Sequence, residues 1–180
     1  MKLDTGTTDL LAELRDDGVL IATLNRPETR NAFSAAMGKA LGSLYQLADL
    51  NDAVRVVVVT GTPPAFCAGA DFSRGSEVFE RADDSEFTSN PINPPAWKIR
   101  KPVIAAIKGH CFGGGLQIAL GADIRYAAPD TRMSVMEIKW GLIPDMSGSQ
   151  TLRDLVGLDV AKELTWTGRQ VDAAEARELG

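Results

Sequence analysis

The fold is decided at Gly109-His110-Cys111-Phe112-Gly113-Gly114-Gly115, a glycine-rich turn between two apolar runs. The run before it, Pro102 to Ile107, has the β-branched composition of a strand, and the run that begins at Leu116 predicts a buried helix. A second turn of small residues, Phe66-Cys67-Ala68-Gly69-Ala70-Asp71, follows the apolar run Val54 to Thr60. Such repeated alternation of strand and helix predicts an α/β protein.

The remaining segments extend the same alternation. Val19 to Leu24 predicts a strand stopped by Asn25-Arg26-Pro27, and Ser34 is expected to cap a helix that runs to Leu50. The four consecutive valines after Val54 predict a strand of a parallel sheet covered on both faces. Further elements are expected as strands at Ile124 to Ala127 and Arg132 to Met136, helices at Leu152 to Leu155 and Val160 to Leu164, and a last helix begun by Asp172 with Glu175.

Composition restricts the class of function. The 180 residues suffice for a single domain, with 44% hydrophobic and 24% charged residues, which is typical of a soluble globular protein. The net charge of −5 and the lack of a basic cluster argue against nucleic acid as a partner. Two cysteines and one histidine offer neither a disulfide framework nor a structural zinc site. No export signal or membrane span is visible, so we expect a cytoplasmic protein.

The glycine triplet points to an anion site. A helix that begins there presents unpaired N–H groups, and two main-chain N–H groups can stabilise a negative oxygen. The simpler interpretation, a tight turn that needs glycine only for packing, is about equally compatible with this run alone. The pattern is neither a dinucleotide fingerprint nor a phosphate loop, and no metal site is predicted.

Glu137 and Asp145 are the carboxylates expected to move protons. Their neighbours include Met136, Ile138 and Trp140, and such an apolar setting raises carboxyl pKa values. A solvated loop acid for Asp145 and a strand-edge ion pair for Glu137 are the alternatives. His110 and Cys67 lack a nucleophile signature around them and are left out of the mechanism.

Several motifs together resemble the enoyl-CoA hydratase/isomerase family, also called the crotonase superfamily, over nearly the whole chain. They occur in family order as Asn25-Arg26-Pro27 with Asn31-Ala32-Phe33, Phe66-x-Ala68-Gly69-Ala70-Asp71, Lys101-Pro102-Val103-Ile104-Ala105-Ala106, Gly109-x-x-x-Gly113-Gly114-Gly115, Ala122-Asp123-Ile124-Arg125 and Gly141-Leu142-Ile143-Pro144. The resemblance implies an α/β crotonase-like (ClpP/crotonase) spiral of repeated ββα units. It also implies trimers or paired trimers, and no metal or redox cofactor, because coenzyme A enters as part of the substrate.

In that family an acyl-CoA thioester carbonyl lies between two backbone N–H groups, which map here to Ala70 and Gly114. The adenine and pantetheine of coenzyme A would lie along residues 68–73, which places Ala68, Asp71, Phe72 and Ser73 in the binding site. We expect Gln117 and Trp140 to line the substrate pocket.

The resemblance leaves the reaction open. Family hydratases carry two glutamates, whose positions here are Gln117 and Glu137, and an amide does not exchange a proton as a carboxylate does. Asp145 resembles the proton-transferring aspartate of the dienoyl-CoA isomerase branch, although that branch has an aspartate where Gln117 stands. Hydration and double-bond isomerisation are therefore both predicted reactions. A weakly catalytic acyl-CoA-binding or assembly protein, and an acyl-CoA hydrolase that uses Asp145, are the alternatives.

Two segments depart from the regular pattern. Residues 74–97 contain many charged residues and three prolines, and we predict a mobile loop there. The sequence ends at Gly180, where family members continue into C-terminal helices, so we expect a single crotonase-like domain truncated at its C-terminal end. Acyl chain length and pathway do not follow from these residues.

Overall fold

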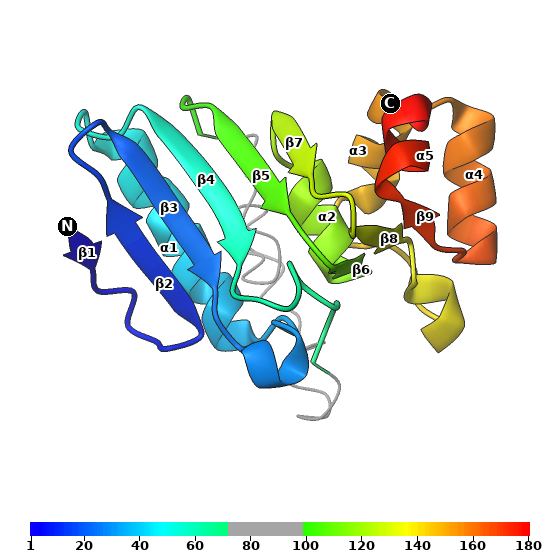
Figure 1. The fold of residues 1–180 in the computed structure, drawn as a ribbon, viewed down its shortest axis with the longest axis horizontal. Helices are drawn as coiled ribbons and strands as arrows, with labels where there is room; N and C mark the ends of the chain where they lie inside the picture. Colours follow the sequence, from blue (N-terminus) through cyan, green and yellow to red (C-terminus); the bar gives the residue numbers. More distant parts are fainter. Residues whose placement is uncertain (72–98) are drawn as a thin grey trace, which may run out of the picture.

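The computed structural model describes residues 1–71 and 99–180. Its main element is a six-stranded sheet with the order β1-β2-β3-β4-β5-β7 (Figure 1). The strands are β1 (Lys2–Leu3), β2 (Leu10–Leu14), β3 (Val19–Leu24), β4 (Val56–Gly61), β5 (Val103–Ile107) and β7 (Ile124–Ala127). Strands β3, β4, β5 and β7 run parallel, whereas β1 and β2 are antiparallel additions at one edge. The predicted α/β class and parallel sheet are confirmed.

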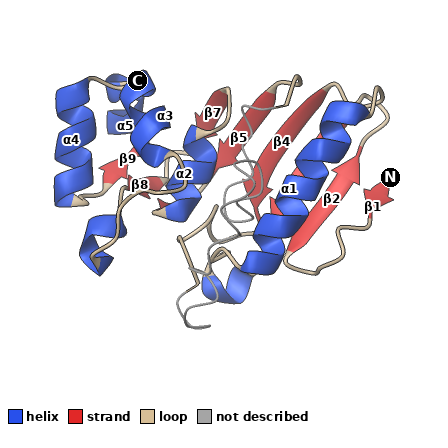
Figure 2. Cartoon of the chain, turned by 180° about the vertical axis from the view of Figure 1, so that it is seen from behind, coloured by secondary structure: helices blue, strands red, loops and turns tan. Residues whose placement is uncertain are grey.

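Helix α1 (Ala35–Leu50) covers one face of this sheet, as the view from behind shows (Figure 2). The hydroxyl of Ser34 accepts a hydrogen bond from the Met37 N–H at 3.1 Å, which confirms the predicted N-cap. The side chains of β3 and β4 alternate between buried and half-buried positions. The expectation that the valine strand is covered on both faces is confirmed for the face that α1 covers, while the other face is half-buried among the described residues.

A second, three-stranded sheet lies at the far end of the molecule from the N-terminus (Figure 1). Its order is β6-β8-β9, from β6 (His110–Phe112), β8 (Arg132–Ser134) and β9 (Val171–Asp172). Helix α2 (Gly114–Leu120) begins directly after β6, so the glycine triplet joins a strand of the small sheet to a buried helix. The sequence predicted the helix but not the short strand β6.

The C-terminal helices pack beside the small sheet (Figures 1 and 2). They are α3 (Gly148–Leu155), α4 (Leu158–Thr167) and α5 (Ala173–Leu179). The Asp172 carboxylate accepts from the Glu175 N–H at 2.9 Å and caps α5 as predicted. The 3-10 turn η1 (Pro27–Thr29) directly follows Arg26, and the 3-10 turn η4 (Glu137–Trp140) carries Glu137 and Trp140. Within the described ranges, no helix has both the length and the apolar character that crossing a membrane requires.

The buried core runs along the covered face of the large sheet and continues under α2 and the C-terminal helices. It joins apolar side chains from both sheets, including Leu20, Val57, Ala105, Leu116 and Leu164. Because one continuous core joins the two sheets, the loops that follow β4, β6 and β8 are held at fixed places between them. The predicted loop at 74–97 lies outside the described residues, so that prediction stays open.

Candidate active site

The turn after β4 is hydrogen-bonded to strand β6. The N–H groups of Phe66 and Cys67 both donate to the His110 carbonyl at 3.1 Å, and the Phe112 N–H donates back to the Cys67 carbonyl at 3.0 Å. The two glycine-rich turns singled out in the sequence therefore lie side by side. Their contact depends on Gly115, because a Cβ there would lie only 2.3 Å from the Cys67 carbonyl oxygen.

The backbone N–H groups of Ala70 and Gly114 are close to each other. A Cβ on Gly114 would lie 4.0 Å from the Ala70 nitrogen, and a Cβ on Gly69 would lie 3.9 Å from the Gly114 nitrogen. Neither N–H donates to any group among the described residues. Gly114 is the first residue of α2, so its N–H lacks an intrahelical acceptor. Two neighbouring free donors of this kind suit an oxygen that carries negative charge.

The residues on both sides of Ala70 are fixed by the segment that precedes α1. The Phe33 N–H donates to the Gly69 carbonyl at 2.7 Å, and the Asp71 N–H donates to the Phe33 carbonyl at 3.1 Å. The Ala68 N–H is used in a similar way, by the Arg30 carbonyl at 3.0 Å. The backbone on both sides of Ala70 is therefore held by hydrogen bonds, while the N–H of Ala70 has no acceptor among the described residues.

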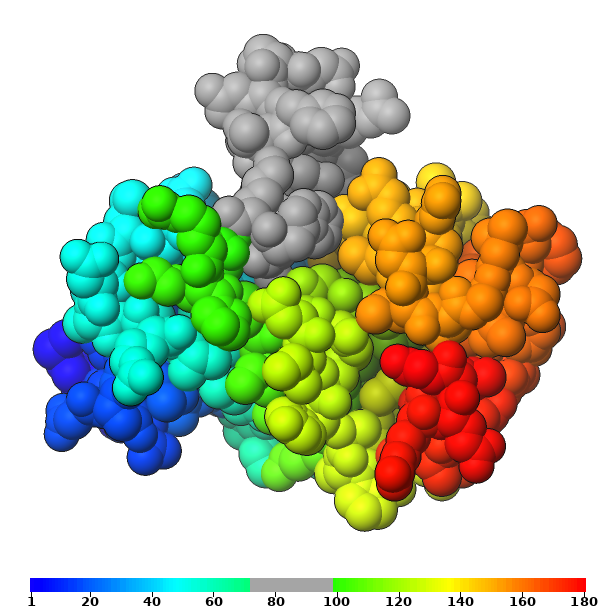
Figure 3. Space-filling model, turned by 90° about the horizontal axis from the view of Figure 1, so that it is seen from above, coloured from blue at the N-terminus to red at the C-terminus, as the bar shows by residue number. Residues whose placement is uncertain are grey.

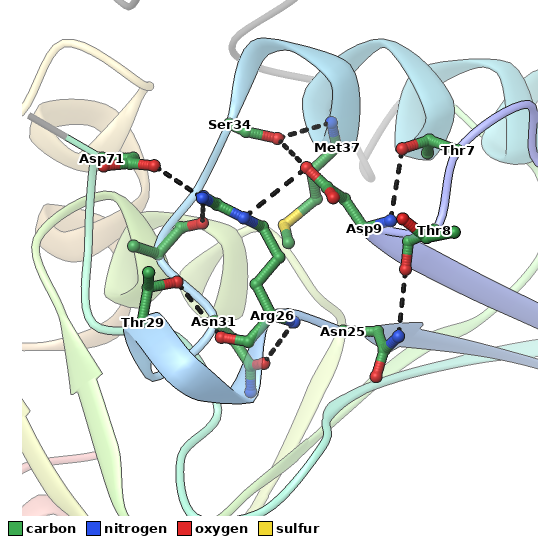
Figure 4. Close-up of polar contacts among 11 residues, drawn as sticks. Thr7, Thr8, Asp9, Asn25, Arg26, Thr29, Asn31, Ser34, Met37 and Asp71 are labelled. Atoms are coloured by element: carbon green, nitrogen blue, oxygen red, sulfur yellow. Dashed lines mark hydrogen bonds and ion pairs between the residues drawn. The ribbon is translucent and has the colours of Figure 1, made fainter. Parts of the chain in front are cut away.

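A buried arginine strengthens this attachment (Figure 4). The Arg26 guanidinium is ion-paired with Asp71 at 2.7 Å and with Asp9 at 3.6 Å, and its Nη1 donates to the Ala32 carbonyl at 2.8 Å. Ser34 donates to the same Asp9 carboxylate at 2.6 Å. Because its carboxylate points toward the buried Arg26, the side chain of Asp71 fixes the loop. The predicted contact of Asp71 with coenzyme A stays a prediction.

Glu137 begins η4 and lies beside the glycine triplet. Its side chain is buried, and a Cβ on Gly113 would lie 3.6 Å from Glu137 Oε1. Burial raises the pKa of Glu137, hydrogen bonds from its own backbone N–H and from Gln117 oppose that rise, and the negative charge of Asp145 adds to it. Oε2 of Glu137 is buried and accepts no hydrogen bond from the described residues. A carboxylate with one free oxygen and a raised pKa is suited to proton transfer.

Gln117 lies against Glu137 from helix α2. Its Nε2 donates to Glu137 Oε1 at 2.6 Å, and its Oε1 accepts from the Gly148 N–H at 2.8 Å. The side chain is 5% exposed and lines a cavity of about 10 Å³ together with Glu137 and Gly113. A cavity of this size holds about one water molecule.

Asp145 and Trp140 are both exposed, and their predicted roles in the site stay predictions. Asp145 is exposed, which fits the solvated loop acid named as its alternative, and its charge acts on Glu137. The physical reason is the path of the chain after Pro144, where residue 145 forms a surface turn before α3. Trp140 is 62% exposed at the end of η4 and does not line the small cavity at Glu137. Phe72 and Ser73 lie outside the described residues.

The two cysteines and His110 belong to the segments that carry the site. Cys67 and Cys111 are buried free cysteines whose backbones form an isolated β-bridge, and burial raises the pKa of the Cys67 thiol to about 12. The His110 ring packs against Phe112 with its centroid at 5.0 Å. These surroundings supply no activated nucleophile.

Sequence reasoning missed two long-range polar links. Arg26 to Asp71 spans 45 positions of the chain, and Gln117 to Gly148 spans 31. Arg26 and Asp71 both belong to motifs recognised in the sequence, but the positions of the motifs do not predict which side chains are in contact. Only the packing of separate elements brings these pairs together.

A larger groove lies beyond the small cavity. It has a volume of about 510 Å³ and lies between β7 and the C-terminal helices, whose atoms flank it in the view from above (Figure 3). It shares four apolar side chains with the cavity at Glu137: Leu116, Leu120, Val135 and Leu152. The groove and the cavity at the candidate proton-transferring group are therefore adjacent and share apolar side chains.

Known proteins resemble this chain over most of its length. Residues 15–180 match the family model described as enoyl-CoA hydratase/isomerase. The chain is 38% identical over 165 residues to a protein of Mycobacterium leprae named "Probable enoyl-CoA hydratase echA8", covering 89% of this chain and 62% of that protein. The chain belongs to the enoyl-CoA hydratase/isomerase family.

Two solved structures show the same fold. One, of a probable enoyl-CoA hydratase/isomerase from Mycobacterium abscessus, has a TM-score of 0.86 at 45% identity, covering 97% of this chain and 66% of that one. The other, from Thermobifida fusca YX and in complex with acetoacetyl-CoA, has a TM-score of 0.82 at 34% identity, covering 96% and 71%. The present chain thus spans about two thirds of the length of these relatives. The crotonase-like fold expected from the motifs is confirmed.

Proposed function

We propose that this chain carries the active site of an acyl-CoA-processing enzyme that hydrates a double bond or moves it along the acyl chain. The observation that carries the proposal is the pair of free N–H groups at Ala70 and Gly114 beside the buried carboxylate of Glu137. A thioester carbonyl oxygen placed between the two donors would be stabilised as it gains negative charge. Removal of a single such donor costs about 10²–10³-fold in known enzymes.

Glu137 is proposed to move the proton. In isomerisation, Glu137 Oε2 takes a proton from carbon, the electron pair of that C–H bond moves toward the thioester oxygen as an enolate, and the proton returns at another carbon. In hydration, Glu137 takes the proton from a water molecule whose oxygen bonds to the β-carbon. The α-carbon of the enolate then takes up the proton that Glu137 received, so the elements of water are added across the double bond and Glu137 is ionised again. The raised pKa of Glu137 suits either exchange.

The acyl group is proposed to extend toward the apolar groove. The groove volume of about 510 Å³ is within the usual range for ligand sites, and its wall is shared with the cavity at Glu137. A series of acyl chain lengths tests this part of the proposal, because a chain that enters the groove should bind more tightly with each added methylene until the groove is full. The trimer implied by the family resemblance also remains a proposal, and light scattering tests it.

The reaction is tested by assaying 2-enoyl-, 3-enoyl- and dienoyl-CoA with the wild type, Glu137→Gln and Asp145→Asn. We expect Glu137→Gln to lower kcat by about 10²–10⁴-fold. Glu13→Gln, at an exposed carboxylate on β2, is the matched control and should leave kcat unchanged. The loss expected for Asp145→Asn is smaller than for Glu137→Gln, because Asp145 is exposed and acts on the site through its charge.

Two outcomes would favour the alternatives. Tight binding of acyl-CoA by calorimetry without turnover of any substrate would indicate a binding protein. Release of free coenzyme A that depends on Asp145 would indicate a hydrolase. Full activity in both carboxylate variants would refute the assignment of the proton-transferring groups.

A further inference from the structure

The side-chain amide of Gln117 is used at both ends within the protein. Nε2 lies 2.6 Å from Glu137 Oε1, and Oε1 lies 2.8 Å from the Gly148 nitrogen. The side chain is buried, and Gly148 is buried at the start of α3. Both the nitrogen and the oxygen of this amide are therefore bonded to protein groups.

Chemistry fixes which way the amide points. A backbone N–H can only donate, so the group that faces Gly148 must be the amide oxygen. The NH₂ group then faces Glu137 and needs an acceptor, which the ionised carboxylate provides. The second carboxylate oxygen, Oε2, accepts nothing from the described residues and lies free in the buried site.

We propose that Gln117 is a positioning residue that holds Glu137 in its ionised form, with Oε1 occupied and Oε2 as the one atom that exchanges the proton. This inference rests on the proposed function, which makes Glu137 the proton-transferring group. The backbone N–H of Gly148 anchors the amide from the other side, so the start of α3 belongs to the same support. Gln117 itself moves no proton.

The charged groups on the elements around Glu137 are unchanged in uncharged variants of Gln117, so a change in the pKa of Glu137 can be attributed to the lost hydrogen bond. Helix α2 carries no charged residue, η4 carries Lys139, and the turn after it carries Asp145, whose charge raises the pKa of Glu137. Helix α3 carries Arg153 and Asp154, which pair with each other at 3.8 Å. Helix α4, which packs against η4, carries Asp159, Lys162 and Glu163. Because loss of the Gln117 donor removes an interaction that lowers the pKa of Glu137, the pKa of Glu137 must rise in such a variant.

Three variants test the proposal. Gln117→Leu removes both hydrogen bonds. Gln117→Glu keeps an acceptor for the Gly148 N–H but cannot donate to an ionised Glu137. Gly148→Ala leaves both polar side chains intact, yet its new Cβ would lie 2.8 Å from Gln117 Oε1 and 2.9 Å from Gln117 Cγ, which displaces the amide.

We expect all three to lower kcat at neutral pH by about tenfold or more, since hydrogen bonds to charged groups contribute about that factor. The acidic limb of the kcat profile should move to higher pH, and KM should change by less than about threefold. Matched controls are Gln46→Leu, the same replacement at an exposed position of α1, and Ser149→Ala, an exposed neighbour of Gly148. Both controls should keep the wild-type profile.

A purely structural role in starting α3 gives a different pattern. If Gln117 only caps that helix, Gln117→Glu keeps the cap and the wild-type pH profile, which would overturn the proposal. A gain of hydration rate in Gln117→Glu would also overturn it, because the added carboxylate would then act as a second proton-transferring group. Each result is read alongside urea unfolding, so that a folding defect is recognised.

A measurement without turnover separates this inference from the proposed function. The Glu137 carboxyl carbon is titrated by ¹³C NMR, with its signal assigned by its absence in Glu137→Gln. A higher titration midpoint in Gln117→Leu and Gly148→Ala supports the positioning role even if no acyl-CoA is converted. An unchanged midpoint in both variants refutes it, whatever the activity.

Discussion

Replacement of Gly115 by alanine tests how the two donor segments are brought together. Gly115 lies within helix α2, so alanine is compatible with its backbone conformation and the effect is steric. The new Cβ would lie 2.3 Å from the Cys67 carbonyl oxygen and 2.7 Å from Cys67 Cβ. Ordinary contacts are longer by about 1 Å, so the two backbones must separate by about that distance.

The magnitude follows from what resists that separation. Overpacking costs about 1–3 kcal/mol when neighbours can shift, and here the neighbour is a carbonyl held by the Phe112 N–H at 3.0 Å. We therefore take a cost of about 3 kcal/mol, reduced by about 1 kcal/mol because alanine favours the helix over glycine. The net expectation is a loss of about 2 kcal/mol in the free energy of unfolding.

The loss is measured by urea unfolding followed by circular dichroism. Gly157→Ala is the control, because there the new Cβ meets only the exposed carboxylate of Asp159, and the change should stay within about 1 kcal/mol. Turnover should fall about 100-fold in Gly115→Ala, since moving Gly114 away from Ala70 weakens one donor. Wild-type stability together with wild-type turnover in Gly115→Ala would refute the reasoning.

Three further expectations concern buried polar groups. Arg26→Met should lower the free energy of unfolding by about 3–5 kcal/mol because it removes one partner of a buried ion pair, whereas Arg15→Met, at an exposed ion pair, should cost less than about 1 kcal/mol in the same urea experiment. Glu137→Gln should be more stable than the wild type at neutral pH, because the raised pKa means that ionisation of Glu137 destabilises the folded state, and the difference should vanish as the pH falls below the ordinary value of 4.5; an equal difference at all pH values would contradict this. Cys67 and Cys111 should resist a thiol reagent such as DTNB at pH 8 in the folded protein and react in urea, since burial raises both pKa values; rapid labelling without denaturant would show that the pair is accessible.

The elements that the sequence predicted best are those with a strong local signal. Strands Val19–Leu24 and Ile124–Ala127 have the predicted bounds, and helix α1 starts at the predicted cap. Strand β2 was missed, although Leu10, Ala12 and Leu14 alternate with exposed residues in the pattern of a half-buried strand. Strands β6 and β9, of three and two residues, carry too little periodicity and were missed, whereas β8 was predicted as a strand that runs two residues further, to Met136.

Burial was harder to predict than secondary structure. The valine run fits a doubly covered strand by composition, yet whether a second layer exists depends on the topology of distant segments. Glu137 and Asp145 are eight positions apart and both have apolar neighbours in the sequence, but the side chain of Glu137 is buried and Asp145 is exposed. The difference arises from the turn between η4 and α3, which local composition does not determine.

The two supports of the site act on different groups, and this separates their effects. Arg26 with Asp71 holds the loop that presents the Ala70 N–H, whereas Gln117 with Gly148 holds Glu137. No residue is common to the two supports, so perturbing one should leave the group held by the other in place. The geometry therefore implies that the N–H groups that bind the oxyanion and the carboxylate that transfers the proton are positioned independently. Gly113-Gly114-Gly115 is the segment that both the Ala70 loop and Glu137 contact.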